Sequence, residues 1–171
     1  MKGIHGVIAA AIFVFAAGCT STAPIGPTSS LSANGGGGTG QEQGGSELPF
    51  KGTYEGLETV GTVPSHHHLD ATGNATHLGL FTVTADWTIG MGMGTGTSTW
   101  RAANGDEFST SFERHGVVTA PTITFTETHT MTGGTGRFAS TSGTFTVVQT
   151  RGLAMPYNNS ATIDGSMNLG R

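Results

Sequence analysis

A glutamate and a histidine two positions apart are the residues of this sequence best suited to proton transfer. Glu127 and His129 lie in the stretch 122–131, whose even positions are all threonine. Its odd positions are Ile123, Phe125, Glu127, His129 and Met131. Because alternate side chains of a β-strand point to the same face, the pair shares the apolar face and is predicted to be buried. A carboxylate and an imidazole held in this way could act as general acid and base.

Three further polar residues, His77, Arg114 and Gln149, each lie an even number of positions from a nearby phenylalanine. If all these faces line one interior, it holds a carboxylate, two imidazoles, a guanidinium and an amide. A buried carboxylate without a partner costs several kcal/mol, so Glu127 needs one, and Arg114 or a histidine is the obvious candidate. The residues predicted to line this interior site are His77, Phe81, Trp87, Arg114, Phe125, Glu127, His129 and Gln149.

Four interpretations of this cluster remain open from the sequence alone. It could be a structural network, or a set of strand ends that face solvent at the mouth of a barrel. It could orient a bound small molecule, or it could carry the acid–base pair of an enzyme. Glu127, His77 and His129 are also metal-ligand types, but their spacing does not define a metal site. We therefore predict neither a metal nor a cofactor.

A second group of possible ligands is the tract 66–68, three consecutive histidines, with Asp70 close by. Short histidine tracts can bind zinc or copper. Adjacent residues of an extended chain point to opposite sides, however, so the triplet is a poor chelate. The tract is expected to be an exposed polar loop after Pro64.

The chain from Leu48 onward has the two-residue periodicity of β-strands and no convincing helical repeat. Short turns join the predicted strands, and Asn104-Gly105 is a strong hairpin signal. Seven strands are predicted, or eight if the second long run bends: 50–59, 74–89, 96–102, 107–118, 122–131, 144–150 and 160–169. The segment around Met91 and Met93 is a flexible connection or a soft apolar flap over a barrel mouth.

These strands have one face rich in threonine and serine and one apolar face that must be buried. Closing an antiparallel meander into a barrel buries that face and removes the sheet edges. A two-sheet sandwich is the alternative. The regular outward threonine pattern favours an eight-stranded antiparallel β-barrel over residues 48–171.

The N-terminus resembles a bacterial export signal. Lys2 is followed by an apolar run, 6–17, that is too short to span a bilayer. The tetrapeptide 16–19, Ala-Ala-Gly-Cys, resembles a lipobox, in which the cysteine is lipidated and becomes the new N-terminus. Cys19 is the sole cysteine of the chain. We therefore predict a signal peptide over 1–18 and a lipid-anchored protein of the bacterial cell envelope, in the outer membrane if the cell has two, because Thr20 is not aspartate.

Residues 19–47 are predicted to form a flexible linker, because they are rich in glycine, serine, threonine and proline. Only 11% of the 171 residues are charged, and the formal net charge is −4. The basic residues are scattered. Nucleic acid is therefore excluded as an expected partner, since phosphate binding needs clustered positive charge.

The segment 132–143, TGGTGRFASTSG, resembles the glycine turn shared by dirigent proteins and allene oxide cyclases. Weaker similarity to bacterial proteins with an allene-oxide-cyclase-like barrel lies in 75–81, in 103–106 and in Glu127-x-His129. The resemblance implies an eight-stranded barrel with an apolar interior, which holds an apolar ligand in the plant members. The catalytic residues of the plant enzymes do not align with this chain, so no activity is carried over.

The sequence thus leaves two expectations for function. The first is a non-enzymatic barrel that binds a small apolar ligand or serves as a structural module of the envelope. The alternative is an isomerase or cyclase that acts on an unsaturated ligand inside the barrel, with Glu127 and His129 as acid and base. A cavity lined by phenylalanine and tryptophan beside this pair would keep both open, whereas a filled core would favour the structural module.

Overall fold

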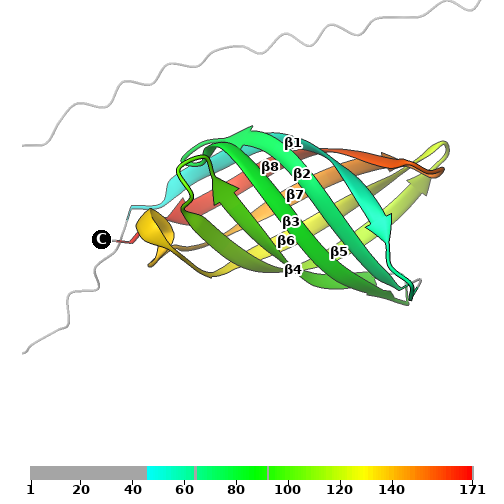
Figure 1. The fold of residues 1–171 in the computed structure, drawn as a ribbon, viewed down its shortest axis with the longest axis horizontal. Helices are drawn as coiled ribbons and strands as arrows, with labels where there is room; N and C mark the ends of the chain where they lie inside the picture. The colour runs from blue at the N-terminus through cyan, green and yellow to red at the C-terminus, as the bar shows by residue number, and fades with distance from the viewer. Residues whose placement is uncertain (1–45, 64, 92, 171) are drawn as a thin grey trace, which may run out of the picture. The chain divides into compact units, whose positions relative to one another are not determined.

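The computed structural model describes residues 46–63, 65–91 and 93–170. It is a closed antiparallel barrel of eight strands with a single 3-10 turn, η1 (Figure 1). The predicted signal peptide, Cys19 and the linker up to residue 45 lie outside the described residues. The elements are β1 (Leu48–Val60), β2 (His66–Ala75), β3 (Gly79–Gly90), β4 (Met93–Ala102), β5 (Glu107–Thr119), β6 (Thr122–Gly134), η1 (Gly136–Phe138), β7 (Ser142–Gly152) and β8 (Tyr157–Asn168).

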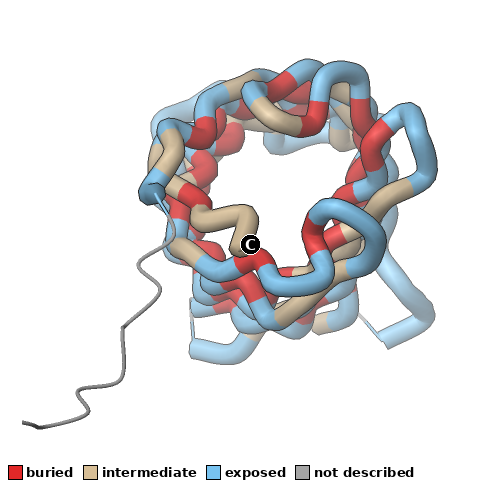
Figure 2. The backbone as a smooth tube through the Cα atoms, turned by 90° about the vertical axis from the view of Figure 1, so that its left-hand side faces the viewer, coloured by how far each residue is buried: buried red, intermediate tan, exposed pale blue. Residues whose placement is uncertain are grey.

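Each strand pairs with the next along the chain, and β8 pairs with β1 to close the barrel. This confirms the predicted barrel over the sandwich. Strands alternate between buried and exposed residues, as Figure 2 shows around the barrel wall. Threonines face outward on β6, while Phe125, Glu127, His129 and Met131 face inward. The two-residue pattern therefore separates the interior from the surface as expected.

The two ends of the barrel differ in which loops they carry. The terminal end has the start of β1, the end of β8 and the β2–β3, β4–β5 and β6–β7 connections. The distal end has the other four hairpin connections, β1–β2, β3–β4, β5–β6 and β7–β8. In Figure 1 the terminal end is on the left, where the C-terminus is marked.

The predicted glycine turn closes the terminal end. It forms the end of β6, the turn η1 and the start of β7, and it places Phe138 in the core with no exposed surface. Gly136 has a φ of +53°, and a Cβ atom there would overlap the carboxylate of Asp106. Gly134 has no positive φ but lies against the carbonyl oxygens of Glu107 and Phe138. The glycines thus allow the connection to lie tightly on the barrel.

The second strand is where the sequence interpretation was wrong. The tract 66–68 is not a loop: it begins β2, and the predicted run 74–89 is the end of β2, a turn and β3. His67 faces inward and is buried, whereas His66 and His68 face outward. The tract was misassigned because three polar residues mask the alternation that continues at Leu69 and Ala71.

The terminal half of the interior is an aromatic core. The rings of Phe50, Trp100, Phe108 and Phe145 contact one another mostly edge to face, with centroids 4.9–6.3 Å apart. Trp100 and Phe108 are stacked. Aromatic contacts of this kind add stability beyond the area they bury. The polar interior residues lie between this core and the distal end.

Among the residues that the structure describes, no helix is long and apolar enough to cross a membrane.

Candidate functional site

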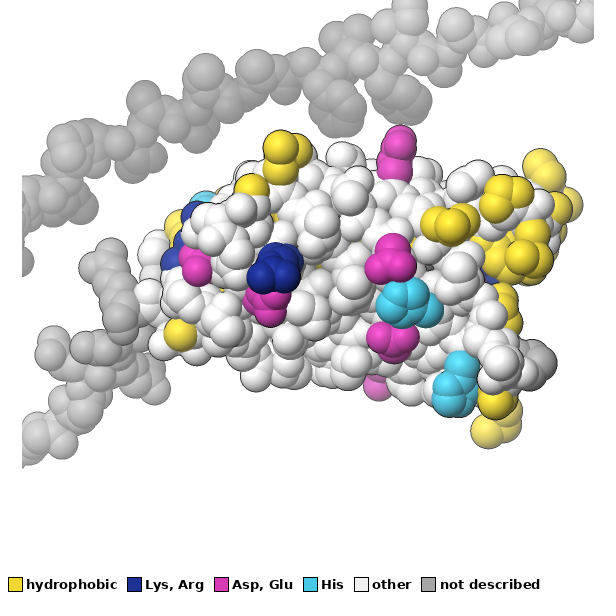
Figure 3. Space-filling view, in the orientation of Figure 1, with side chains coloured by type: hydrophobic (Ala, Val, Ile, Leu, Met, Phe, Trp, Pro, Cys, Tyr) yellow, Lys and Arg dark blue, Asp and Glu magenta, His cyan; other side chains and the backbone are white. Residues whose placement is uncertain are grey.

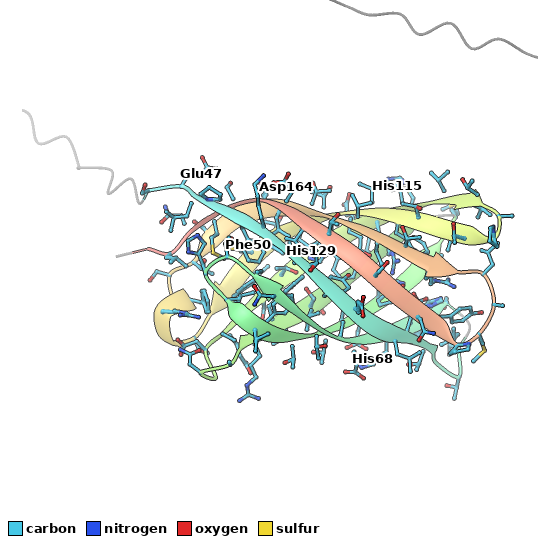
Figure 4. All side chains as sticks on the ribbon, turned by 90° about the horizontal axis from the view of Figure 1, so that it is seen from above. Glu47, Phe50, His68, His115, His129 and Asp164 are labelled. Carbon is cyan, nitrogen blue, oxygen red and sulfur yellow. The ribbon has the colours of Figure 1, made fainter. Side chains whose placement is uncertain are left out.

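His129 on β6 lies at the centre of the interior, next to the aromatic core (Figure 4). Its imidazole is stacked between the rings of Phe112 and Phe145, with centroids 4.7 and 4.8 Å away. Its Nδ1 lies 2.9 Å from the hydroxyl of Thr110, and its Nε2 lies 3.1 Å from a carboxylate oxygen of Glu127. Both faces and both nitrogens of the ring are therefore occupied by protein groups.

Glu127 has the partners that its burial requires. One carboxylate oxygen is the hydrogen-bond partner of Nε2 of His129, and the other lies 3.3 Å from a terminal nitrogen of Arg114. The carboxylate and the guanidinium are each less than 6% exposed. Both partners predicted for Glu127, an arginine and a histidine, are thus present. Arg114 lies directly opposite Glu127 in the pairing of β5 with β6, and His129 is two residues along the same strand.

A chain of hydrogen bonds leads from the aromatic core to Glu127. The indole N–H of Trp100 donates to Ser98, whose hydroxyl lies 2.6 Å from that of Thr110. The indole of tryptophan can only donate, so the Ser98 hydroxyl accepts from it and can donate its own proton to Thr110. The Thr110 hydroxyl can then donate its proton to Nδ1 of His129. His129 then carries its proton on Nε2 and donates it to Glu127. The donors all run in one direction and end on the carboxylate.

The chain continues on the far side of the carboxylate. Arg114 donates to the side-chain oxygen of Gln149 at 2.9 Å, and Gln149 donates to Asn159. Asn159 in turn donates to the backbone carbonyl of Tyr157 at 2.9 Å. Residues of five consecutive strands, β4 to β8, are therefore joined by one polar network.

The guanidinium of Arg114 is held between two aromatic rings. Its central carbon lies 3.7 Å from the centroid of Phe125 and 4.4 Å from that of Trp87. Such cation–π contacts are strongest where water is absent. Burial lowers the pKa of Arg114 from its usual value, and the carboxylate of Glu127 opposes that shift. Room for this long side chain comes from Gly94 on β4, where a Cβ atom would overlap it.

A second buried ionic group lies toward the distal end. Glu58 on β1 contacts Nδ1 of His67 at 2.9 Å and Nε of Arg151 at 3.1 Å. The imidazole of His67 stacks on Trp87, and the guanidinium of Arg151 lies over Tyr157. The interior thus contains two carboxylates and two guanidiniums, so that its formal charges balance when both histidines are neutral.

Tyr54 on β1 faces the same interior and is 4% exposed. Burial raises the pKa of its hydroxyl well above the usual value, and the negative charge of Glu127 raises it further. The phenol therefore remains neutral over the physiological range of pH.

One predicted site residue lies elsewhere. His77 is in the turn between β2 and β3 at the terminal end, half-buried, with a φ of +66°. The strand on which its parity was counted begins only at Gly79, so the count did not apply to it. The structure places the other predicted residues in the barrel interior: Phe81, Trp87, Arg114, Phe125, Glu127, His129 and Gln149.

Several interior polar residues were not predicted, although most carry the same parity signal. Thr110 lies between the inward-facing Phe108 and Phe112, and Ser98 is in phase with Trp100. Short hydroxyl side chains were taken as outward-facing because the surface is so rich in them. The other inward-facing polar residues that were missed are Tyr54, Glu58, His67, Arg151 and Asn159.

The metal interpretations have no geometric support over the described part of the chain, where no three histidine, cysteine or acidic side chains are grouped to hold an ion. His68 instead bridges two outward carboxylates, Asp86 at 2.7 Å and Asp70 at 3.3 Å. The hydrogen bond that His68 donates to the carboxylate of Asp86 raises the pKa of His68 above its usual 6.5.

Four grooves in the described chain are lined mainly by outward-facing residues of the barrel wall. One, of about 320 Å³, lies over β1 to β4, where threonines and the outward His66 and His68 line it together with the inward-facing His67 and Trp87. Neither Glu127 nor His129 lines any of the four. The lining that the ligand hypothesis requires is therefore not seen at these grooves.

Comparisons of this chain with protein-family models, with curated proteins and with solved structures found no match.

Proposed function

We propose that this protein is a non-enzymatic structural module of the bacterial cell envelope, held there by a lipid on Cys19. The described barrel is the module, and residues 19–47 are its tether. The proposal takes the structural alternative foreseen from the sequence rather than the ligand-binding one.

The observation that carries the proposal is that Glu127 and His129 have no free polar atom. Both oxygens of Glu127 and both nitrogens of His129 contact protein groups, and two phenyl rings cover the imidazole. A general base must reach the proton that it abstracts. A pair engaged in this way, with two rings over the imidazole, favours a structural role over proton transfer to a substrate.

The packing of the interior supports the same conclusion. Trp100, Phe108, Phe145 and Val147 are at most 2% exposed. A cavity wide enough for a small molecule would leave part of its lining accessible, and sites of this kind measure roughly 300–1,000 Å³. Side chains of this size in mutual contact fill the terminal half of the barrel as a core.

The sequence supports the location. A basic start, a short apolar run and Ala-Ala-Gly-Cys precede a glycine-rich stretch, which is the order expected of an anchored envelope protein. A glycine turn similar to that of allene oxide cyclases and dirigent proteins supports a shared barrel architecture without a shared activity.

The anchor is tested by Cys19→Ser. Because a thioether-linked lipid is the proposed attachment, the variant is expected to leave the detergent-extracted envelope and to accumulate as a released or uncleaved form. Wild-type processing and membrane fractionation of the variant would refute the lipid anchor.

The filled interior is tested by native mass spectrometry of the wild-type protein extracted from its own envelope. The expected mass is that of the lipidated polypeptide alone. An additional small molecule that is lost on Trp100→Ala but retained in a surface variant such as Arg101→Ala would show that the interior holds a ligand. That result would restore the ligand-binding alternative and, for an unsaturated ligand, the isomerase or cyclase.

A further inference from the structure

The distal end of the barrel carries exposed apolar side chains on all four of its hairpins. Figure 3 shows hydrophobic side chains gathered at this end, on the right. We call these eight residues the distal apolar ring: Val60, Val63, Met91, Met93, Val117, Val118, Leu153 and Met155. Each is at least 40% exposed. Because consecutive hairpins follow one another around a closed barrel, the residues encircle the end.

Met91 shows that folding alone does not account for the ring. Its side chain is fully exposed, and its φ of +51° lies in the left-handed region, which is unfavourable for methionine. Glycine or asparagine would suit such a turn better, and a polar side chain would suit water better. An exposed apolar residue at a position that neither the backbone nor water favours supports a contact with something outside the barrel.

The distal hairpins also carry no acidic residue and no lysine or arginine. This holds for the segments 60–66, 90–94, 115–122 and 152–157. Exposed charges lie on the barrel wall and at the terminal end instead, for example Asp106 and Arg137 in its connections and the Lys51–Asp164 pair. In a chain with a formal net charge of −4, the distal end is the part that could approach an anionic surface without repulsion.

The shape of the distal end favours a fluid partner over a structured one. No residue of the distal apolar ring lines the four grooves described above, one of which reaches this end at Gly61 and His66. Valine, leucine and methionine on separate convex loops do not form a slot for a helix or a strand. They can enter the boundary between headgroups and acyl chains, where apolar side chains gain free energy by leaving water.

We infer that the distal apolar ring docks on a lipid bilayer surface. The inference rests on the proposed function in one respect: the lipid on Cys19 would keep the barrel beside a membrane. Residues 20–45 could reach roughly 90 Å when extended. A strand of 13 residues such as β1 is at most about 43 Å long, so a tether that joins the terminal end allows the distal end to touch the same bilayer.

The experiment places an environment-sensitive fluorophore at either end of the full chain. In the Cys19→Ser background the chain has no other thiol, so Met91→Cys labels the ring and Leu80→Cys labels an exposed apolar position at the terminal end. Vesicles of phosphatidylethanolamine and phosphatidylglycerol are then added. The emission of the fluorophore at position 91 is expected to shift to shorter wavelength and to increase severalfold in intensity, also at high salt. The emission of the fluorophore at position 80 is expected not to change.

A second arm uses the chain without labels. Met91→Ser combined with Met155→Ser is expected to lower vesicle partitioning at least tenfold relative to the matched control Leu80→Ser. Urea unfolding of the three proteins should agree to within experimental error, because the exchanged side chains are exposed.

Two results would overturn the inference. Equal responses of the two labels, or equal partitioning of the variants, would show that the N-terminal segment alone binds vesicles. A change at position 91 that depends on protein concentration and not on lipid would show that the ring meets a second copy of the chain. Failure of the lipid anchor would appear separately, in the fractionation of Cys19→Ser, and would leave the response of the label intact.

Discussion

The guanidinium of Arg114 lies over the ring of Phe125 inside the barrel, with its central carbon 3.7 Å from the ring centroid. The same central carbon lies 4.4 Å from the centroid of the Trp87 ring, and a terminal nitrogen of Arg114 reaches Glu127 and Gln149. One side chain therefore joins residues of β3, β6 and β7 to its own strand, β5. The fold should depend more on this arginine than on any arginine of the outer wall.

Arg114→Met is expected to destabilise the protein by about 3–5 kcal/mol, because it leaves Glu127 buried with an unbalanced charge. The stability of Arg114→Lys should lie between that of Arg114→Met and that of the wild type, since lysine keeps the charge but not the planar contacts. Urea unfolding measures both. Arg101→Met, at the exposed pair with Glu107, is the control and should cost less than about 1 kcal/mol. Equal losses of unfolding free energy in Arg101→Met and Arg114→Met would contradict the interior role of Arg114.

Glu127→Gln and His129→Gln should each weaken folding, because each removes a partner from a buried network. In a double-mutant cycle their effects should be non-additive by at least about 0.5 kcal/mol, since the two side chains are in direct contact. The measurement is chemical denaturation of the four proteins. Single changes that are neutral or stabilising would instead indicate a functional site, where polar groups are kept at the expense of stability.

Gly136→Val is expected to destabilise by more than about 1 kcal/mol, because its φ is positive and a Cβ atom would overlap Asp106. Gly134→Val should have a comparable effect for a different reason, its close approach to backbone carbonyls. Gly90→Ala, where a Cβ atom meets open space, is the matched control. Thermal unfolding of the three variants compares them. Unchanged stability at 136 would rule out the tight closure of the terminal end.

The His68–Asp86 pair should make stability depend on pH. The pKa of His68 is raised in the folded state, chiefly by Asp86, so the folded protein binds this proton more tightly than the unfolded one. The stabilisation that the His68–Asp86 pair contributes is complete at pH values below the pKa of His68 in the unfolded protein, about 6.5. It is lost as pH rises through the higher pKa of His68 in the folded protein. Urea midpoints of the wild type measured against those of His68→Gln should converge with rising pH. A difference that grows with pH would reverse this sign.

The two-residue pattern was sufficient to predict the barrel and most of its interior, because threonine on one face and large apolar residues on the other leave a single way to orient a strand. It placed Glu127, His129, Arg114 and Gln149 correctly. It could not place His77, since parity has meaning only within one strand and the strand boundary at Gly79 follows a turn with a positive φ.

The partners within the interior were less predictable than its members. That Arg114 lies opposite Glu127 depends on register, and an irregularity between Ser109 and Thr110 shifts the pairing of β5 with β6. The stacking of His129 between two phenylalanines depends on how three strands meet in space. No local pattern encodes these relations, so the choice between a network and a site required the structure.

The seam between β1 and β8 has a consequence for the order of events in biosynthesis. The other strand pairings join neighbours along the chain, whereas the seam joins Leu48 to Met167. Translation delivers β8 after the other seven described strands, so until its residues emerge, the first seven strands form an open sheet with two unpaired edges. Such edges invite pairing between chains. The nascent chain is therefore vulnerable to aggregation until β8 (Tyr157–Asn168) has been made, and deleting β8 should be far more harmful than deleting an equal number of residues from 20–45.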